Sequence, residues 1–292
     1  MTSSESAPSA LGDLLTLMKV RLNSLVVFTT GGGYYMAAGD HVDALGLVGT
    51  CLSTALVASG AAGLNQVAER DVDILMNRTR SRPVPAGRMT PATGRMISIG
   101  LALLGLAGLV LVANVEAVVV AVVTFLTYVL IYTPLKRRTS LSTVVGAVPG
   151  ALPPLIGWAA AGGSLAAPAP WALFLLMFFW QLPHFLAISW LYREDYGRAH
   201  LPMLAVVDTG GQMTGRQAAL WAATLIPVTL LPSALRMVDA AYGVGALILG
   251  IAFLATAVKF AMNRSRDNAR LLFLTSITYL PLLWILMAAT RA

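Results

Sequence analysis

Long apolar blocks constrain this chain more than any other feature of its sequence. They recur along its length and run for about 18 to 22 residues, which lets an α-helix cross a hydrocarbon layer about 30 Å thick. Only 11% of the residues are charged, against about a quarter in soluble domains. A water-facing globule and a disordered chain are therefore both excluded. The sequence predicts an all-α, polytopic membrane protein.

Nine stretches fit this length when the apolar blocks are read against helix-breaking residues. The expected spans are 20–37, 44–65, 94–113, 116–133, 141–161, 170–191, 214–234, 241–262 and 270–289. The fifth contains Pro149, Pro153 and Pro154, so we expect a broken helix whose freed backbone groups face protein or a cavity. Residues 1–18 are expected to form a mobile tail before a single transmembrane domain, residues 19–292.

Basic residues indicate how the chain crosses the membrane. With the N-terminus in the cytoplasm, all of the 20 Lys and Arg except Arg236 and Arg291 fall on the cytoplasmic side. This pattern predicts a multi-pass protein of the cell membrane with its C-terminus outside. The basic residues that give the chain its net charge of +7 lie between the spans. They therefore indicate membrane topology and anionic ligands rather than a nucleic-acid partner. The single cysteine, Cys51, excludes an intramolecular disulfide.

The first polar motif lies at the predicted cytoplasmic end of the second span. Asn65, Glu69 and Asp73 are spaced four residues apart, so a helix presents all three on one face. Carboxylate and amide oxygens at this spacing suit Mg²⁺, whose coordination is completed by water and substrate phosphate. Asp71 is expected to point elsewhere. The alternative is a solvated helix end whose acids balance nearby arginines.

Basic residues follow this motif directly. The next loop contains Arg78, Arg80, Arg82 and Arg88 between prolines and a glycine, and arginine forks match phosphate oxygens. The end of the fourth span adds Lys136 and Arg137, with Tyr132 one turn earlier. Positive-inside charge, contact with lipid headgroups and an interfacial belt aromatic are the alternatives for these residues.

The third polar group belongs to the sixth span and the loop that follows it. Gln181 and His184 lie within an apolar helix, where polar side chains are costly and therefore candidates for function. The alternative is that they satisfy the backbone carbonyl freed by Pro183. Glu194 and Asp195 repeat the pattern of carboxylates at a cytoplasmic helix end.

Together, these groups predict an intramembrane cavity that opens to the cytoplasm, with carboxylates and arginines at its mouth and an apolar interior. Such a site fits a substrate with a diphosphate head and a long hydrocarbon tail. Ionising an allylic diphosphate requires metal and cations to stabilise the leaving charge, and the carbocation requires a dry pocket.

The motifs, in this order, resemble the UbiA superfamily of intramembrane prenyltransferases, and within it the protohaem IX farnesyltransferases, or haem O synthases. The resemblance covers about residues 20–290. It rests on the NxxxExxxD motif at 65–73, MNRTRSRP at 76–83, YTPLKR at 132–137, GAVPGALPPLIGW at 146–158, WQLPHF at 180–185, and Asp195–Tyr196 followed by PML at 202–204. WQLPHF and the later DY and PML motifs are typical of the haem branch.

The resemblance implies about nine helices around a central cavity, with Mg²⁺-dependent binding of farnesyl diphosphate. It also implies farnesyl transfer to a vinyl group of haem B, with addition of water, giving haem O and diphosphate. Catalytic and metal-binding roles would fall to Asn65, Glu69, Asp73 and Asp195. Substrate-binding roles would fall to Arg78, Arg82, Lys136, Arg137, Gln181, His184, Glu194 and Tyr196. His184 would face the haem as an iron ligand or as an orienting group.

Two positions depart from the superfamily pattern. Ala199 stands four residues after Asp195, where many relatives have a second aspartate, so a second complete metal site is not expected. Glu69 replaces an aspartate of many relatives, which keeps the carboxylate and lengthens its reach.

Other functions stay open at this point. The same chemistry could act on an aromatic acid or on another porphyrin, and the WQLPHF pattern favours haem. A small-solute transporter would suit the broken fifth span, but the polar residues gather at one face and no second broken helix is expected. A pure scaffold leaves the acid-bearing segments unexplained. A haem A synthase or an oxidase-assembly protein is a candidate partner.

Overall fold

The computed structural model describes residues 9–292, and residues 1–8 of the expected tail lie outside this range. In chain order the elements are α1 (Ala10–Leu17), α2 (Val20–Ala37), α3 (Ala44–Ala68), α4 (Arg70–Asp73), α5 (Pro91–Val112), α6 (Val115–Leu126), the π-helical segment η1 (Thr127–Tyr132), α7 (Thr133–Leu135), α8 (Ser142–Ala151), α9 (Pro153–Ala160), α10 (Pro168–Leu191), α11 (Arg193–Arg198), α12 (Leu204–Val207), α13 (Gln212–Thr229), α14 (Leu231–Ala234), α15 (Ala240–Met262) and α16 (Arg266–Ala289). Apart from one isolated bridge between Val238 and Arg291, the described residues contain no β-structure. The all-α prediction is confirmed.

Eight segments of the described chain are long and apolar enough to cross a membrane. They are Ala44–Ala68, Pro91–Val112, Val115–Leu135, Ser142–Ala160, Pro168–Leu191, Gln212–Ala234, Ala240–Met262 and Arg266–Ala289, and they coincide with eight of the expected spans. The remaining expected span is α2, an 18-residue helix. It is less apolar than the others because it contains Arg21, Asn23 and a run of Thr and Gly, yet it packs against α3 and α9 within the bundle.

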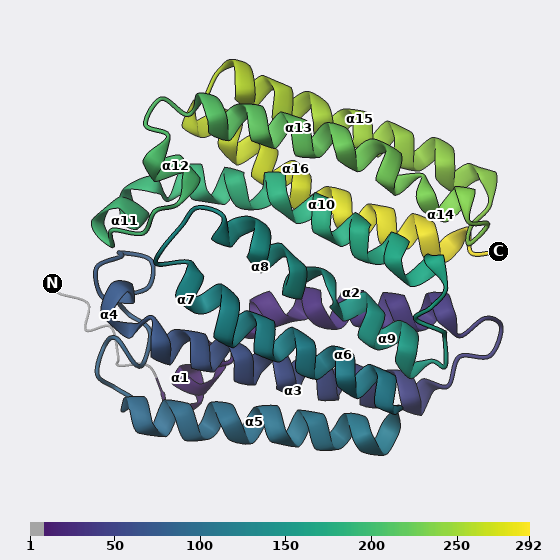
Figure 1. Ribbon diagram of the computed structural model, residues 1–292, viewed down its shortest axis with the longest axis horizontal. Coiled ribbons are helices and arrows are strands. Elements are labelled where there is room, and N and C mark those ends of the chain that lie inside the picture. Colours follow the sequence, from purple (N-terminus) through teal and green to yellow (C-terminus); the bar gives the residue numbers. More distant parts are fainter. Residues whose placement is uncertain (1–8) are drawn as a thin grey trace, which may run out of the picture.

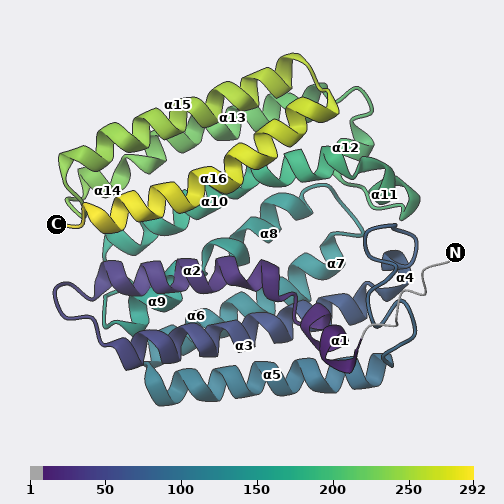
Figure 2. The ribbon, with the colours of Figure 1, turned by 180° about the vertical axis from the view of Figure 1, so that it is seen from behind.

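The long helices lie side by side along the longest axis of the molecule (Figure 1). α3 packs on α5, α13 packs on α15, and α10 contacts both α13 and α16. Seen from behind, α2 lies between α16 and α3 (Figure 2). The helices alternate in direction, so α4 and α11 lie together at one end while the C-terminus lies at the other (Figure 1). The acid-bearing segments predicted from the sequence are therefore neighbours.

The fifth span is a broken helix, as predicted. α8 ends at Ala151 and α9 begins at Pro153, with Leu152 between them. α9 can approach α2 closely because glycines lie at the contact: a Cβ on Gly33 would collide with the carbonyl of Pro154, and one on Gly157 with that of Thr30. Protein therefore covers the backbone at this break, which is the condition for irregular structure at membrane depth.

The expectation that no second helix is broken was wrong. The seventh span divides into α13, ending at Thr229, and α14, beginning at Leu231. Pro232 lies in the first turn of α14 and Pro227 lies inside α13. Because proline lacks an N–H group and clashes with the preceding turn, two prolines five residues apart explain the break.

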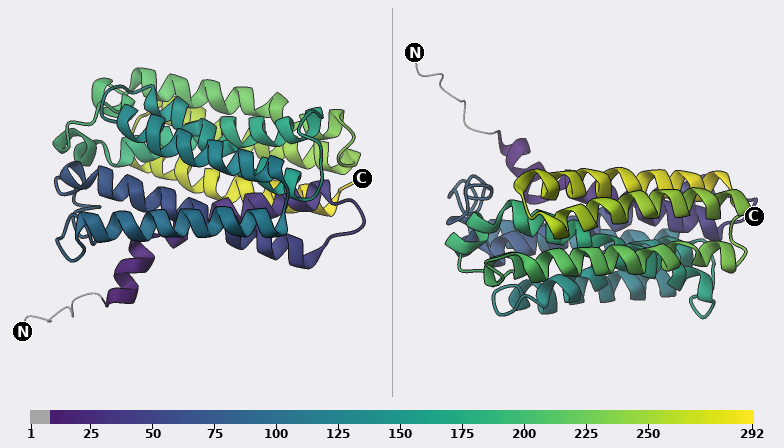
Figure 3. Two further views of the ribbon diagram at one scale, coloured as in Figure 1. Left: turned by 60° about the horizontal axis from the view of Figure 1, so that its bottom comes forward. Right: turned by 90° about the horizontal axis from the view of Figure 1, so that it is seen from above.

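Residues 10–17, which were expected to belong to a mobile tail, form a helix instead. This helix, α1, stands out from the bundle at the end where α4 lies (Figure 3). Leu17 is fully buried in an apolar cluster with Val67 and Val84. Asp13 is buried and forms an ion pair of 2.8 Å with Arg88. Residues 10–17, expected to be mobile, are therefore helical and packed, because this short helix has an apolar side and a partner for its acid.

Candidate active site

Asn65, Glu69 and Asp73 lie at the end of the bundle where α3 passes into α4. α3 ends at Ala68 and Glu69 occupies the junction, but the backbone N–H of Glu69 donates to Asn65 O (2.9 Å) and that of Asp73 to Glu69 O (2.8 Å). These bonds keep the helical spacing across the junction. All three side chains are buried, with exposed fractions of 3%, 2% and 1%, whereas Asp71 is exposed. The predicted shared face exists.

Each of the three residues contacts one cationic side chain. Lys136 Nζ lies 2.9 Å from Glu69 Oε2, and Arg82 Nη1 lies 2.7 Å from Asp73 Oδ2. Lys19 Nζ donates to Asn65 Oδ1 at 2.9 Å. Lys136 and Arg82 were predicted as phosphate ligands, and the structure brings both to the carboxylates. Lys19 was missed: it precedes α2 in a left-handed conformation (φ 49°), and no local motif marks it.

The charges of this cluster depend on one another. Burial alone would raise the pKa of Glu69, but the ammonium groups of Lys136 and Lys19 hold it below its usual value. Burial alone would lower the pKa of Lys136, but Glu69 raises it above its usual value. Burial and repulsion from Arg82 lower the pKa of Lys19 to about 7. Glu69 and Lys136 are therefore a charged pair at neutral pH.

Each carboxylate keeps one oxygen without a partner. Glu69 Oε1 and Asp73 Oδ1 are buried and accept no hydrogen bond from the described residues. A buried carboxylate oxygen without a partner is costly, so it marks a place where a cation or a donor is missing. Two such oxygens beside the Asn65 amide fit Mg²⁺, which often takes only one or two protein carboxylates. No cluster of three or more His, Cys, Asp or Glu able to hold a metal occurs among residues 9–292.

Asp195 lies against the loop that follows α4, and its oxygens are occupied. The backbone N–H groups of Asn77 and Arg78 donate to its two oxygens at 3.4 and 3.3 Å, and Arg198 pairs with it. Tyr196 is buried, and its hydroxyl accepts a hydrogen bond of 3.3 Å from Arg78. In this structure Asp195 joins α11 to the loop that follows α4. Its role as a metal ligand stays a prediction.

Two predicted substrate ligands lie at the surface. Arg137 Nη2 is 2.6 Å from Asp71 Oδ2, and both side chains are about half exposed. Glu194 is exposed. Arg137 therefore pairs with Asp71, the acid that points away from the buried cluster. Helical spacing places Asp71 on a different face from Glu69 and Asp73. Roles for Arg137 and Glu194 in substrate binding stay predictions.

Gln181 and His184 bind other helices and not their own backbone. Gln181 Nε2 donates to Ala147 O of α8 at 2.8 Å, and His184 Nδ1 lies 2.7 Å from Ser276 Oγ of α16. The idea that they satisfy the carbonyl freed by Pro183 is therefore wrong. Thr133 lies in the YTPLKR motif, but no role was predicted for it: its hydroxyl accepts a hydrogen bond of 3.2 Å from Asn65 Nδ2.

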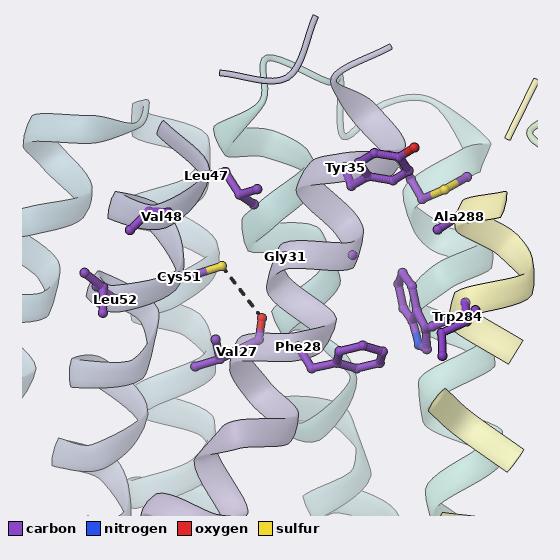
Figure 4. Close-up of a pocket in the computed structure, with 13 residues that line it drawn as sticks. Val27, Phe28, Gly31, Tyr35, Leu47, Val48, Cys51, Leu52, Trp284 and Ala288 are labelled. Carbon is purple, nitrogen blue, oxygen red and sulfur yellow. Dashed lines mark hydrogen bonds between the residues drawn. The ribbon is translucent and has the colours of Figure 1, made fainter. Parts of the chain in front are cut away.

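An apolar pocket of about 520 Å³ lies between α2, α3 and α16 (Figure 4). Phe28, Cys51 and Trp284 are among its lining residues, and Cys51 Sγ donates to Val27 O at 3.8 Å. None of the predicted site residues lines it. The apolar interior expected next to the carboxylates stays a prediction.

Comparison with known proteins agrees with this geometry. A model of the UbiA prenyltransferase family matches residues 25–284. A protoheme IX farnesyltransferase of Solibacter usitatus is 42% identical over 288 residues, covering 96% of this chain and 98% of that relative. One of Anaeromyxobacter sp. is 44% identical over 286 residues, covering 97% of this chain and 96% of that relative.

Solved structures share the fold at low sequence identity. A digeranylgeranylglyceryl phosphate synthase superimposes with a TM-score of 0.79 at 17% identity, covering 96% of this chain and 98% of its own. A UbiA homologue of Archaeoglobus fulgidus, bound to GPP and Mg²⁺, superimposes with a TM-score of 0.63 at 15% identity, covering 94% of this chain and 99% of its own. The helical bundle, the family match and the full-length relatives agree: the chain belongs to the UbiA prenyltransferase family.

Proposed function

We propose that this chain transfers the farnesyl group of farnesyl diphosphate to a vinyl group of haem B, with addition of water, giving haem O and diphosphate. Relatives more than 40% identical over nearly their whole length are named protoheme IX farnesyltransferase. The observation in the structure that carries the proposal is the buried pair Glu69 and Asp73, each bound to a cation and each with a free oxygen. This arrangement suits a metal-bound diphosphate.

Asn65, Glu69 and Asp73 would hold Mg²⁺, and Asp195 is a further candidate ligand. When bound, Mg²⁺ neutralises part of the diphosphate charge and so favours departure of that group. A structure of the family, from Archaeoglobus fulgidus, is bound to GPP and Mg²⁺. Mg²⁺ would provide a partner for the buried oxygens of Glu69 and Asp73 that accept no hydrogen bond.

The basic residues bind the diphosphate oxygens. Lys136 and Arg82 already stand at the carboxylates, so an incoming diphosphate meets cations and metal ligands together. Arg78 is held beside Tyr196 and lies 4.9 Å over the Tyr192 ring, which orients its guanidinium. Because these groups are fixed before the substrate binds, they stabilise the leaving charge without reorganisation.

The acceptor would bind deeper in the bundle. Gln181 and His184 lie in α10, away from its end beside α11, and both are held by contacts with neighbouring helices. Trp180 and Phe273 stack on the His184 ring and provide aromatic surface around it. We place this site at the cytoplasmic face of the cell membrane, with the N-terminus inside and the C-terminus outside. A haem A synthase or an oxidase-assembly protein is the proposed partner.

Purified full-length protein tests this proposal. Incubation with haem B, farnesyl diphosphate and Mg²⁺, followed by chromatography and mass analysis, is expected to give haem with a hydroxyethylfarnesyl group. A parallel reaction with an aromatic acid in place of haem B is expected to give no product. Prenylation of the aromatic acid alone would show that the family chemistry acts on a different acceptor.

A further inference from the structure

His184 and Ser276 form a hydrogen-bonded chain between α10 and α16. Ser276 is fully buried, and its Oγ lies 2.7 Å from His184 Nδ1. The same oxygen lies 2.6 Å from the carbonyl oxygen of Phe273, one turn earlier in α16. The hydroxyl group of Ser276 therefore has two short contacts but only one proton.

The shorter contact decides where that proton lies. A hydroxyl oxygen and a carbonyl oxygen repel each other at this distance unless a proton lies between them, so Ser276 donates to Phe273 O. Ser276 Oγ can then only accept from His184. Nδ1 of His184 must carry a proton, and in a neutral imidazole Nε2 is left with a free lone pair.

Aromatic rings hold the imidazole in this orientation. The ring of Trp180 stacks on one side with centroids 5.1 Å apart and an interplanar angle of 22°, and Phe273 stacks with values of 5.2 Å and 30°. Trp180 itself is fixed, because its Nε1 donates to Ser276 O at 2.9 Å. Stacking and the Ser276 bond together restrict rotation of the ring, so the direction of Nε2 is set.

Among residues 9–292, the ring of His184 makes its hydrogen bond through Nδ1, and Nε2 makes none. A histidine prepared in this way has the usual arrangement of a metal ligand, in which one ring nitrogen donates to the protein and thereby fixes the tautomer while the other binds the metal. Haem iron is commonly bound by such a histidine.

We propose that Ser276 is a positioning residue that holds His184 as the Nδ1–H tautomer, so that Nε2 donates its lone pair to the iron of the porphyrin acceptor. The only bond formed is the coordinate bond from Nε2 to iron, and no electron is transferred. This inference rests on the proposed function, since only a metalloporphyrin acceptor offers an iron. His184 lies about two turns, or roughly 10 Å, from the end of α10 beside α11, so coordination also fixes how deep the porphyrin sits.

Binding of two porphyrins to the purified full chain tests this role. Haem B and metal-free protoporphyrin IX are titrated into the wild type, His184→Ala, Ser276→Ala and Ser276→Thr, and the visible spectrum of haem B reports its ligand. Ser189→Ala is the matched control, because Ser189 is a buried serine of the same helix as His184 whose hydroxyl has no partner in the described chain.

Haem B in the wild type and in Ser189→Ala is expected to show an imidazole-ligated spectrum, which His184→Ala loses. Ser276→Ala is expected to bind haem B about 10-fold or more weakly, with metal-free porphyrin unaffected, and Ser276→Thr is expected to retain the spectrum. An unchanged haem B spectrum and affinity in Ser276→Ala would overturn the inference, but it would not contradict haem B as the acceptor. Equal weakening of both porphyrins would also overturn it, since it would show a purely structural role. Failure of the wild type to bind haem B would instead contradict the proposed acceptor.

Discussion

Lys136 donates a hydrogen bond to Glu69 across 2.9 Å, and this contact joins the end of the fourth span to the end of the second. The Glu69 side chain is 2% exposed and that of Lys136 is 13% exposed. A carboxylate this deeply buried is stable in its charged form only beside a cation. The pair therefore contributes both to the packing of the bundle and to the charge of the site.

Removing Lys136 is expected to destabilise the protein as well as inactivate it. Lys136→Met leaves Glu69 charged and without its cation, which costs about 3 kcal/mol or more, so the melting temperature in detergent falls. Arg137→Met is the matched control: Arg137 pairs at the surface with Asp71, and an exposed pair contributes at most about 1 kcal/mol. Equal melting temperatures for the two variants would refute the buried-pair interpretation.

Combining Lys136→Met with Glu69→Gln is expected to restore much of the lost stability, because the pair is then replaced by neutral side chains. The double variant is expected to stay inactive, since it lacks both a metal ligand and a phosphate ligand. Thermal unfolding and the farnesyl-transfer assay on the same preparation separate these two effects. Recovery of activity in the double variant would remove both residues from the mechanism.

Two aspartates of one segment provide a comparison of site and surface. Asp73→Asn removes a buried carboxylate with a free oxygen and is expected to lower the transfer rate by about 100-fold or more. Asp71→Asn changes the exposed acid that pairs with Arg137 and is expected to keep the rate within a few-fold. Product formation measured at saturating farnesyl diphosphate checks both variants. A similar loss of transfer rate in both variants would mean that burial does not distinguish site residues from surface residues in this segment.

Removal of divalent cations is expected to stop the reaction without unfolding the protein. The buried carboxylates retain Arg82 and Lys136 as partners when no metal is bound, so the protein is expected to stay folded in chelator, with its melting temperature lowered only by the loss of metal binding. Transfer activity is expected to vanish and to return with Mg²⁺. Activity that persists in chelator would contradict the assignment of Asn65, Glu69 and Asp73 as metal ligands.

The packing of α1 on the bundle can be tested with two leucines of this helix. Leu17→Ala empties a fully buried position and is expected to cost about 2–5 kcal/mol. Leu15→Ala, on the same helix, changes a side chain that is 46% exposed and is expected to have little effect. Melting temperatures in detergent decide between them. An equal, small effect would mean that α1 does not dock on the bundle in solution.

Eight of the nine expected spans were predictable because a membrane demands a fixed length of apolar helix. The break in the fifth span was predictable from Pro153 and Pro154. The shared face of Asn65, Glu69 and Asp73 was predictable from helical periodicity alone. Their burial follows from the same face turning toward the bundle.

Contacts between distant segments were not predictable. Lys19 and Thr133 meet Asn65 only because α2 and α7 pack beside α3. No motif marks Lys19, and the YTPLKR motif that contains Thr133 does not indicate this contact. Ser276 is one serine in an apolar helix, and its role depends on the approach of His184 from α10. The helix α1 was missed because eight residues are too few for a strong periodic pattern.

Haems extracted from the membranes of a host that lacks its own haem farnesyltransferase, with and without this chain, test the central claim most directly. The account predicts that the wild-type chain produces a haem with a hydroxyethylfarnesyl group, and that Asp73→Ala, present in the membrane at the same level, produces none. Haem B alone in both samples, from membranes shown to contain the folded wild-type protein, would contradict it.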